Sequence, residues 1–286
     1  MCLIVIAHQT NVNYPFVLAA NRDEFFSRPT MEANFWADDA NALPNILGCR
    51  DLVQGGTWLG ITRDRRFAAV TNIRNPDAPQ AMPKSRGELT RGFLEGNQSP
   101  AMYLNSLKSS LNQFAGFNLL LGDAEEVFYL NNTQSTITKL EPGIYGLSNG
   151  VLDSAWPKLQ RAKRDLGNAM AGESELQTDT LLNFMNNRDR AADENLPDTG
   201  VPLEQERILS SAFIQNPERK YGTRCSTAII YGANNKIKFS EQNYDEQGYD
   251  ITKELESYNS KSVGKLSEGK VIFQVVMAET AYPVQL

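Results

Sequence analysis

The sequence predicts a mixed α+β fold in which packed sheets are covered by helices. Three observations support this prediction: apolar residues come in short runs of strand length, helical periodicity is confined to two stretches, and the elements follow the order strands, helices, strands, helices, strands. The strict alternation of strand and helix that is typical of a parallel sheet does not occur. Because the 286-residue chain has no repeat, linker or compositional break, we expect a single domain over residues 1–286.

The first part of the chain predicts two buried hairpins. Apolar runs at 3–7 and 16–20 flank a polar, turn-forming stretch, and runs at 58–62 and 67–71 flank a charged loop. We interpret the glycines at 55–58 as turn geometry that requires a positive φ. Later apolar runs predict six further strands, which are 117–121, 126–130, 144–148, 226–231, 236–239 and 271–275.

Two stretches carry helical periodicity. Ser85 and Glu88 have the spacing of a capping box and precede an apolar face, which predicts the start of a helix, and the pattern continues through 102–111. The stretch 154–209 is again helical in pattern. The polar segment 187–200 interrupts it and is a candidate lid.

Charge and hydropathy narrow the classes of partner. A net charge of −6 argues against a basic face that would bind nucleic acid or anionic lipid, so we expect partners that are neutral, small or cationic. A small-molecule ligand or substrate fits this expectation. No apolar stretch is long enough to cross a bilayer, and the amino terminus lacks the features of a secretory signal. We therefore expect a soluble protein.

Cysteine and histidine usage indicates a compartment. The three cysteines, Cys2, Cys49 and Cys225, are odd in number and widely spaced, which favours reduced thiols in a cytoplasmic protein. With His8 as the only histidine, a histidine-rich zinc site is excluded and we expect no metal site. The oligomeric state is not indicated by the sequence.

Cys2 is a candidate nucleophile because of its position. Removal of Met1, which a small second residue permits, leaves a thiol and a free α-amine on one residue. An α-amine titrates at about 7.7–8.0 and a thiol at about 8.5, and nearby positive charge favours the thiolate. A dyad with His8 is geometrically poor, since the two residues lie about 20 Å apart along a strand. The alternative is that Cys2 is a small apolar residue in a buried strand.

The predicted first hairpin brings a polar cluster to Cys2. If its strands pair, residues 21–24, of sequence Asn-Arg-Asp-Glu, emerge beside that cysteine. There Arg22 would lower the pKa of the thiol, and Asp23 would hold the α-amine through a charge-assisted hydrogen bond. The alternative is a solvated turn that needs no special cause.

Three ordered motifs are distinctive: MCLI at 1–4, LAANRDEF at 18–25 followed by Arg28-Pro29, and GGTWLG at 55–60. They resemble the NRDE family, also called the transport and Golgi organisation family. The similarity continues through GLSNG at 146–150 and YGTRCST at 221–227, and covers most of the chain up to about residue 232. That family is similar to the N-terminal-nucleophile hydrolases, near the bile-salt hydrolases and penicillin V acylases. The resemblance implies a four-layer αββα sandwich.

The resemblance also implies a set of site residues. In the acylases the nucleophile is supported by an arginine, an aspartate, an oxyanion-hole residue, an asparagine and a distal arginine. Carried over by motif, the catalytic set is Cys2, Arg22, Asp23, Asn72, Asn149 and Arg224. The acylases space the first arginine and the aspartate apart, whereas here they are adjacent and diverge in an extended strand.

Two functions follow from the resemblance. The first is a cysteine amidohydrolase or acyltransferase for a nonpeptide amide or thioester, which needs no cofactor and uses donors from Asn149 and the Asn72 region to stabilise the oxyanion. The alternatives for these residues are turn positions, and for Arg224 a structural ion pair. The second function is the carriage of haem, acyl-CoA or lipid without cleavage. Iron ligands would come from His8, Cys2, Cys49 or a methionine, although the sequence has no haem attachment motif.

Overall fold

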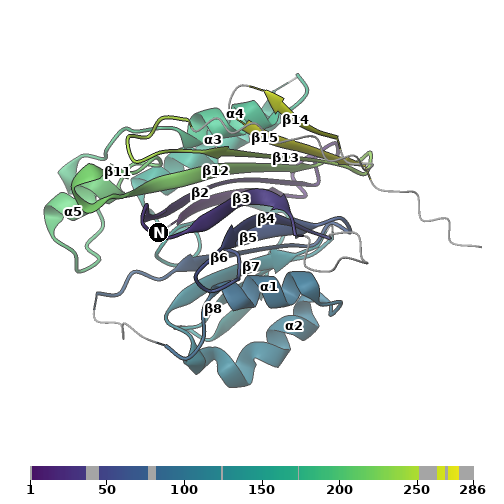
Figure 1. Ribbon diagram of the computed structural model, residues 1–286, viewed down its shortest axis with the longest axis horizontal. Helices are drawn as coiled ribbons and strands as arrows, with labels where there is room; N and C mark the ends of the chain where they lie inside the picture. The colour runs from purple at the N-terminus through teal and green to yellow at the C-terminus, as the bar shows by residue number, and fades with distance from the viewer. Residues whose placement is uncertain are drawn as a thin grey trace, which may run out of the picture.

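The computed structural model describes residues 2–36, 45–76, 82–123, 125–172, 174–250, 263–267 and 270–276. Within these ranges the chain forms four layers, with two antiparallel sheets packed face to face and helices on both outer surfaces (Figure 1). The αββα sandwich that the sequence resemblance implies is therefore confirmed.

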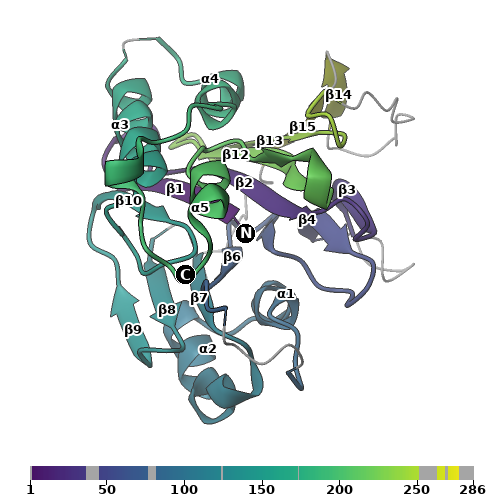
Figure 2. The ribbon, with the colours of Figure 1, turned by 90° about the vertical axis from the view of Figure 1, so that its left-hand side faces the viewer.

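Sheet A is the layer that contains the start of the chain. In spatial order its strands are β10 (Gly143–Leu147), β1 (Cys2–His8), β2 (Phe16–Phe25), β12 (Tyr221–Tyr231), β13 (Lys236–Asn243), β15 (Lys270–Val276) and β14 (Val263–Ser267), and β11 (Gln215–Asn216) pairs with β12. Its outer face is covered by α3 (Pro157–Ala171) and α4 (Thr178–Met185), while α5 (Leu203–Leu209) lies toward the amino-terminal end of β1 (Figure 2).

Sheet B is the second inner layer. In spatial order its strands are β3 (Thr30–Phe35), β4 (Ile46–Asp51), β5 (Leu59–Thr62), β6 (Phe67–Asn72), β7 (Phe117–Gly122), β8 (Val127–Asn131) and β9 (Thr136–Lys139). Its outer face is covered by α1 (Gly87–Glu95) and α2 (Pro100–Leu107). Short 3₁₀ turns occur at Lys108–Gln113, Asp193–Asn195 and Pro217–Arg219.

The β1–β2 hairpin is buried on both faces, which explains why its strands appear in the sequence as continuous apolar runs. Side chains alternate between two cores. Cys2 and Ile4 join the core that sheet A shares with sheet B, whereas Leu3 and Val5 pack under α3 and α4. Each full burial of such an aliphatic side chain contributes about 1.5–3 kcal/mol, so the hairpin is held firmly from both sides.

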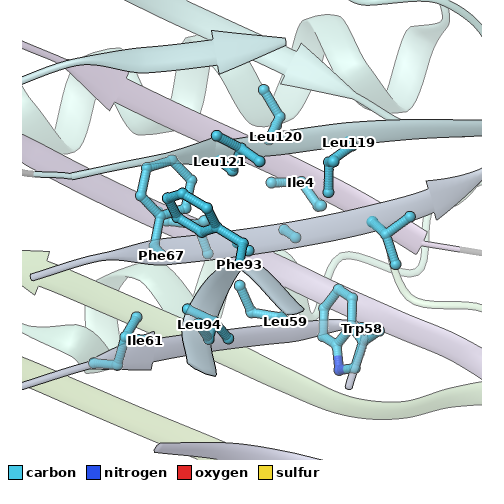
Figure 3. Packing of buried hydrophobic residues seen from close by; sticks show 14 of the residues in the cluster. Ile4, Trp58, Leu59, Ile61, Phe67, Phe93, Leu94, Leu119, Leu120 and Leu121 are labelled. Atoms are coloured by element: carbon cyan, nitrogen blue, oxygen red, sulfur yellow. The ribbon is translucent and has the colours of Figure 1, made fainter. Parts of the chain in front are cut away.

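The core of sheet B extends to the helix that covers it. Figure 3 shows Phe93 and Leu94 of α1 beside Leu59 and Phe67 of the sheet. All four side chains are nearly inaccessible to solvent. This packing fixes α1 on the sheet, and with it the loop that leads into the helix.

The capping box predicted for α1 is present in part. The Glu88 carboxylate accepts the Ser85 backbone N–H at 2.9 Å, as the motif requires. The Ser85 hydroxyl accepts a 3.3 Å hydrogen bond from Gly87 rather than from Glu88. The reciprocal contact still orders the turn before the helix.

Every predicted strand overlaps an observed one, but the apolar runs did not indicate β3, β4 and β9 of sheet B or β11 and β14 of sheet A. β3 and β9 form the two edges of sheet B and leave most of their side chains partly or fully exposed, so they carry no continuous apolar run. The glycine interpretation at 55–58 is confirmed at Gly55, whose φ is 72°.

The polar segment 187–200 is tied to the helix layer. Arg161 of α3 contacts Asp189 at 2.8 Å, and the Ala191 backbone N–H donates to Ser210 after α5 at 2.9 Å. Its role as a lid stays a prediction. Among the residues that the structure describes, no helix combines the length and apolar character needed to cross a membrane.

Candidate active site

A pocket of about 520 Å³ opens at the end of the sandwich where β1 begins and β2 ends. Its walls come from both sheets and from the loop before α1, and include Cys2, Arg22, Asn72 and Arg86. Antiparallel pairing causes this convergence, because it places the first residue of β1 beside the last residues of β2 and β10.

Cys2 lies on the pocket wall and is 8% exposed. Its cross-strand partner on β2 is Arg22, and its carbonyl accepts a 2.8 Å hydrogen bond from Ser148 at the end of β10. Burial raises the pKa of the Cys2 thiol to about 11, against the lowering effects of nearby positive charge and of a hydrogen bond from the Asp23 backbone. At neutral pH the thiol would therefore need a base to take its proton before it could act as a nucleophile.

Arg22 and Asp23 point to opposite faces of sheet A, as adjacent residues of a strand do. Arg22 has the parity of Leu18 and Ala20, which face sheet B, and it stands between its register partners Cys2 on β1 and Cys225 on β12. The predicted divergence is therefore real. It puts the guanidinium on the thiol side of the sheet and the carboxylate on the helix side.

Asp23 belongs to a buried polar cluster under the helix layer. Its Oδ1 accepts a 2.7 Å hydrogen bond from Thr223, and its carbonyl accepts the Tyr221 hydroxyl at 3.2 Å. Burial raises the pKa of Asp23 above its ordinary value, while the positive charge of Lys158 on α3 opposes that rise. The start of β1 lies at the edge between both faces, so a free amine on Cys2 would lie within the influence of this carboxylate.

Lys158 is a buried cation that sequence reasoning missed. Burial lowers its pKa to about 8, with Asp23 acting in the opposite direction. Its Nζ donates to the Leu209 carbonyl at 2.9 Å. In the sequence it is one lysine on an amphipathic helix, where solvent exposure is the usual outcome, so only the packing of α3 on sheet A reveals it.

Asn72 and Asn149 meet where the two sheets approach each other. Asn72 ends β6 and lines the pocket, and its carbonyl accepts the Asn149 side-chain amide at 2.8 Å. Asn149 is 1% exposed, and its own carbonyl accepts the Arg74 backbone N–H. The structure thus brings Asn72 to the pocket wall, with Asn149 behind it as a clamp between the sheets.

Arg224 lies at an irregularity of β12, where the register with β2 shifts between Thr223 and Cys225. Its Nη1 donates to the carbonyls of Phe25 and Arg28, each at 3.0 Å. Arg224 is not among the described residues that line the pocket. Its guanidinium holds the turn that follows β2, next to the loop that carries Arg28.

Comparison with known proteins identifies the family. The family model described as Transport and Golgi organisation 2 matches residues 1–246. The chain belongs to the Transport and Golgi organisation 2 family. The mouse and human Transport and Golgi organization 2 homologues are each 32% identical to it over 80% of this chain and 86% of their own length. The Drosophila melanogaster Transport and Golgi organization protein 2 is 27% identical over 85% of this chain and 92% of its own.

A solved structure extends the comparison from the family to the fold. The Caenorhabditis elegans ortholog of N-acylethanolamine-hydrolyzing acid amidase matches with a TM-score of 0.50, covering 80% of this chain and 92% of that chain. The two sequences are only 11% identical, so the likeness concerns the fold alone. This member of the Transport and Golgi organisation 2 family has the N-terminal-nucleophile hydrolase fold.

His8, the haem ligand considered for this family, lies at the opposite end of β1 from the pocket. It is 2% exposed and pairs across the sheet with Phe16 and Gly143. Burial lowers the pKa of His8. In the described part of the chain, no cluster of three or more histidine, cysteine or acidic side chains has the arrangement of a metal site. The haem alternative stays a prediction.

The other two cysteines flank Arg22 from different sides. Cys225 is its register partner on β12, and Cys49 of β4 lines the pocket from sheet B. Both thiols are buried and free, and burial raises their pKa values, that of Cys49 to about 12. Unlike Cys2, neither adjoins the chain terminus, so neither would gain an amine base by processing.

Basic residues of the pocket rim were also missed by sequence reasoning. Arg28 is paired with Asp51 at 2.6 Å, whereas Lys84 and Arg86 extend from the loop before α1. In a sequence such residues look like an ordinary solvated loop. Their signal was their place just before a helix start, but the fold was needed to bring that start to Cys2.

Proposed function

We propose that the chain is an N-terminal cysteine hydrolase or acyltransferase that acts on a nonpeptide amide or thioester. The observation that carries the proposal is the position of Cys2 on the pocket wall, with Arg22 as its cross-strand neighbour. Membership of the family and the N-terminal-nucleophile hydrolase fold support it. The proposed reaction requires no cofactor.

The reaction begins once Met1 has been removed. The Cys2 α-amine takes the thiol proton while Sγ adds to the substrate carbonyl carbon. Collapse of the tetrahedral intermediate breaks the C–N bond, and the ammonium returns the proton to the departing nitrogen. Water then adds to the thioester with the amine as base, which releases the carboxylic acid and restores the thiol. An acceptor alcohol or amine in place of water gives acyl transfer.

The buried surroundings support the following roles for the neighbouring residues. Because burial raises the pKa of Cys2 to about 11, few thiolates exist at neutral pH without help, and Arg22 supplies positive charge on that face. Asp23 steadies the amine from the helix side. Asn72 is the candidate oxyanion donor because it lines the pocket, and Asn149 positions it.

Acylation by an activated ester tests the proposal. The purified chain is treated with 4-nitrophenyl hexanoate, and the mass of the intact protein and of its amino-terminal peptide is measured. We expect a mature chain that lacks Met1 and carries a single acyl group on Cys2. Cys2→Ala should prevent labelling, whereas Cys225→Ala, which removes a buried thiol outside the pocket wall, should not.

A chain with one glutamate inserted between Met1 and Cys2 isolates the role of the amine. The thiol then keeps its pocket but loses its own α-amine, so we expect the acylation rate to fall by about 10²–10⁴-fold, the usual range for a lost general base. Retention of Met1 in the native protein, equal labelling of all three cysteines, or full activity of the insertion variant would each refute the proposal.

A further inference from the structure

Four cations line the pocket, against the three carboxylates of Asp23, Glu24 and Asp51. Arg22, Lys84 and Arg86 all line it, and none makes an ion pair with any residue that the structure describes. Arg28 differs, because both its Nε and its Nη2 donate to Asp51. The pocket thus contains one arginine in an ion pair and three cations that form none with the described residues.

Arg22 is the most unusual of these cations. Arg22 is only 6% exposed, yet its Nη1 has no hydrogen-bond partner among the described residues. Burying a charged donor without a partner is costly, and native structures retain such a group where it serves a purpose. The guanidinium is placed to receive an acceptor that arrives through the pocket.

Arg86 and Lys84 extend the positive wall toward solvent. Arg86 donates to the Gly116 carbonyl at 3.2 Å and lies close enough to Cys2 for its charge to act on the thiol. The positive end of the α1 dipole adds to this wall, although the first N–H groups of the helix already bond to Ser85 and Arg86. Glu24 and Asp23 also line the pocket and oppose this positive charge. One oxygen of Glu24 accepts the Phe25 N–H, and Asp23 Oδ1 accepts a hydrogen bond from Thr223.

We propose that this wall binds the anionic end, a carboxylate or a phosphate, of the acyl substrate that Cys2 attacks. The inference rests on the proposed function and narrows its substrate class to acyl compounds with a negative charge near the scissile bond. Arg22 contacts the anion in the buried part of the pocket. Arg86 and Lys84 attract and hold it at the rim, where planar guanidinium and flexible ammonium groups suit oxyanions.

Binding to an inactive variant separates this inference from catalysis. Cys2→Ala is titrated calorimetrically with N-hexanoylglycine, with N-hexanoylethanolamine phosphate and with neutral N-hexanoylethanolamine. We expect at least one anion to bind more tightly than the neutral probe by about tenfold or more, since charge-assisted hydrogen bonds are involved. The preference should shrink as salt rises from about 50 to about 500 mM. The two anionic arms distinguish a carboxylate substrate from a phosphate one.

Substitutions in the same background locate the site. Arg86→Met should remove most of the preference, and Lys84→Met, at an exposed position that does not threaten folding, should reduce it. Arg91→Met is the matched control, because Arg91 lies on α1, pairs with Glu95 and is not among the described residues of the pocket wall. Equal or undetectable binding of all three probes, or a preference that survives both variants, overturns the inference. If the anion preference holds but native Cys2 is not acylated, the proposed reaction fails while the anion site stands.

Discussion

The residues at the two ends of β1, Cys2 and His8, are both buried but have different surroundings. At one end Cys2 is 8% exposed and faces a pocket beside an arginine whose Nη1 lacks a hydrogen bond among the described residues. At the other end His8 is 2% exposed, paired on both sides by strands, and lines no part of that pocket. The two ends therefore differ in the pocket and in the nearby cation, whereas a buried nitrogen without a hydrogen-bond partner among the described residues occurs at both, Arg22 Nη1 and His8 Nδ1.

The charged groups around Cys2 divide in the same way. Arg74 and Glu206 form an ion pair at 2.8 Å with side chains that are 8% and 4% exposed. Arg22 is buried to a similar degree but lacks such a partner. If the Arg74–Glu206 pair is structural and Arg22 serves a ligand as proposed, substitutions at the two sites should have opposite effects on stability and activity.

Breaking the frame has the largest expected effect. Glu206→Ala removes the carboxylate that neutralises Arg74, and loss of one partner of a buried pair costs about 3–5 kcal/mol of unfolding free energy. Urea denaturation measures it. Glu204→Ala is the control on the same helix, because its pair with Arg207 is exposed and should contribute no more than about 1 kcal/mol. Equal losses for the two variants would contradict the division.

Arg22→Met should show the opposite signature. We expect the rate of Cys2 acylation to fall by about 10²–10³-fold, as for a lost electrostatic donor. The free energy of unfolding should stay unchanged or rise, because the variant replaces a buried charge without a partner by an apolar side chain. The acylation rate is measured in quenched time points and the free energy of unfolding by urea denaturation, both on the same preparation. His8→Gln, at the far end of β1, is the control that should acylate normally; a large stability loss in Arg22→Met with intact acylation would contradict the assignment.

Much of the fold was predictable because its central strands are buried on two faces. The apolar runs at β1, β2 and β7 appear as strands in any reading of the pattern. The edge strands β3 and β9 were not predicted because most of their side chains are partly or fully exposed and so form no continuous apolar run. The packing of the two sheets on each other depends on residues far apart in the sequence, so no short stretch of sequence predicts it.

The candidate site was predictable only as far as its motifs extend. The NRDE motif and the amino-terminal position indicated Cys2 and Arg22, which the register indeed makes neighbours. Lys158 and Arg86 were missed because a charged residue on an amphipathic helix or in a loop usually faces water. Lys158 is buried because α3 packs on sheet A, and Arg86 reaches the pocket because α1 packs on sheet B. Both residues are far from Cys2 in the sequence.

The clamp between the sheets has an intermediate expected effect. Asn149→Ala leaves the Asn72 carbonyl without its 2.8 Å donor, and loss of such a part-buried hydrogen bond costs about 0.5–1.5 kcal/mol of stability. Because Asn72 lines the pocket, acylation should also slow. Asn183→Ala, at an exposed position of α4, should lie within about 0.5 kcal/mol of the parent. If Asn149→Ala matches that control in urea denaturation, the clamp does not stabilise the site end.

His8, at the far end of β1, should affect the pH dependence of stability rather than the activity. Burial lowers the pKa of His8 in the folded chain, so the unfolded chain binds this proton at higher pH than the folded one. Stability from His8 is therefore fully present above about pH 6.5, its ordinary pKa, and is lost as pH falls toward the lower folded value. Urea denaturation of the parent and of His8→Gln from about pH 7.5 to about pH 5.5 separates the contribution of His8 to the pH dependence of stability, since the other titrating groups are common to both. The parent should lose more stability over that interval than the variant. Parallel curves would mean that the folded chain accommodates the imidazolium, and that the contrast between the two ends of β1 lies in the pocket alone.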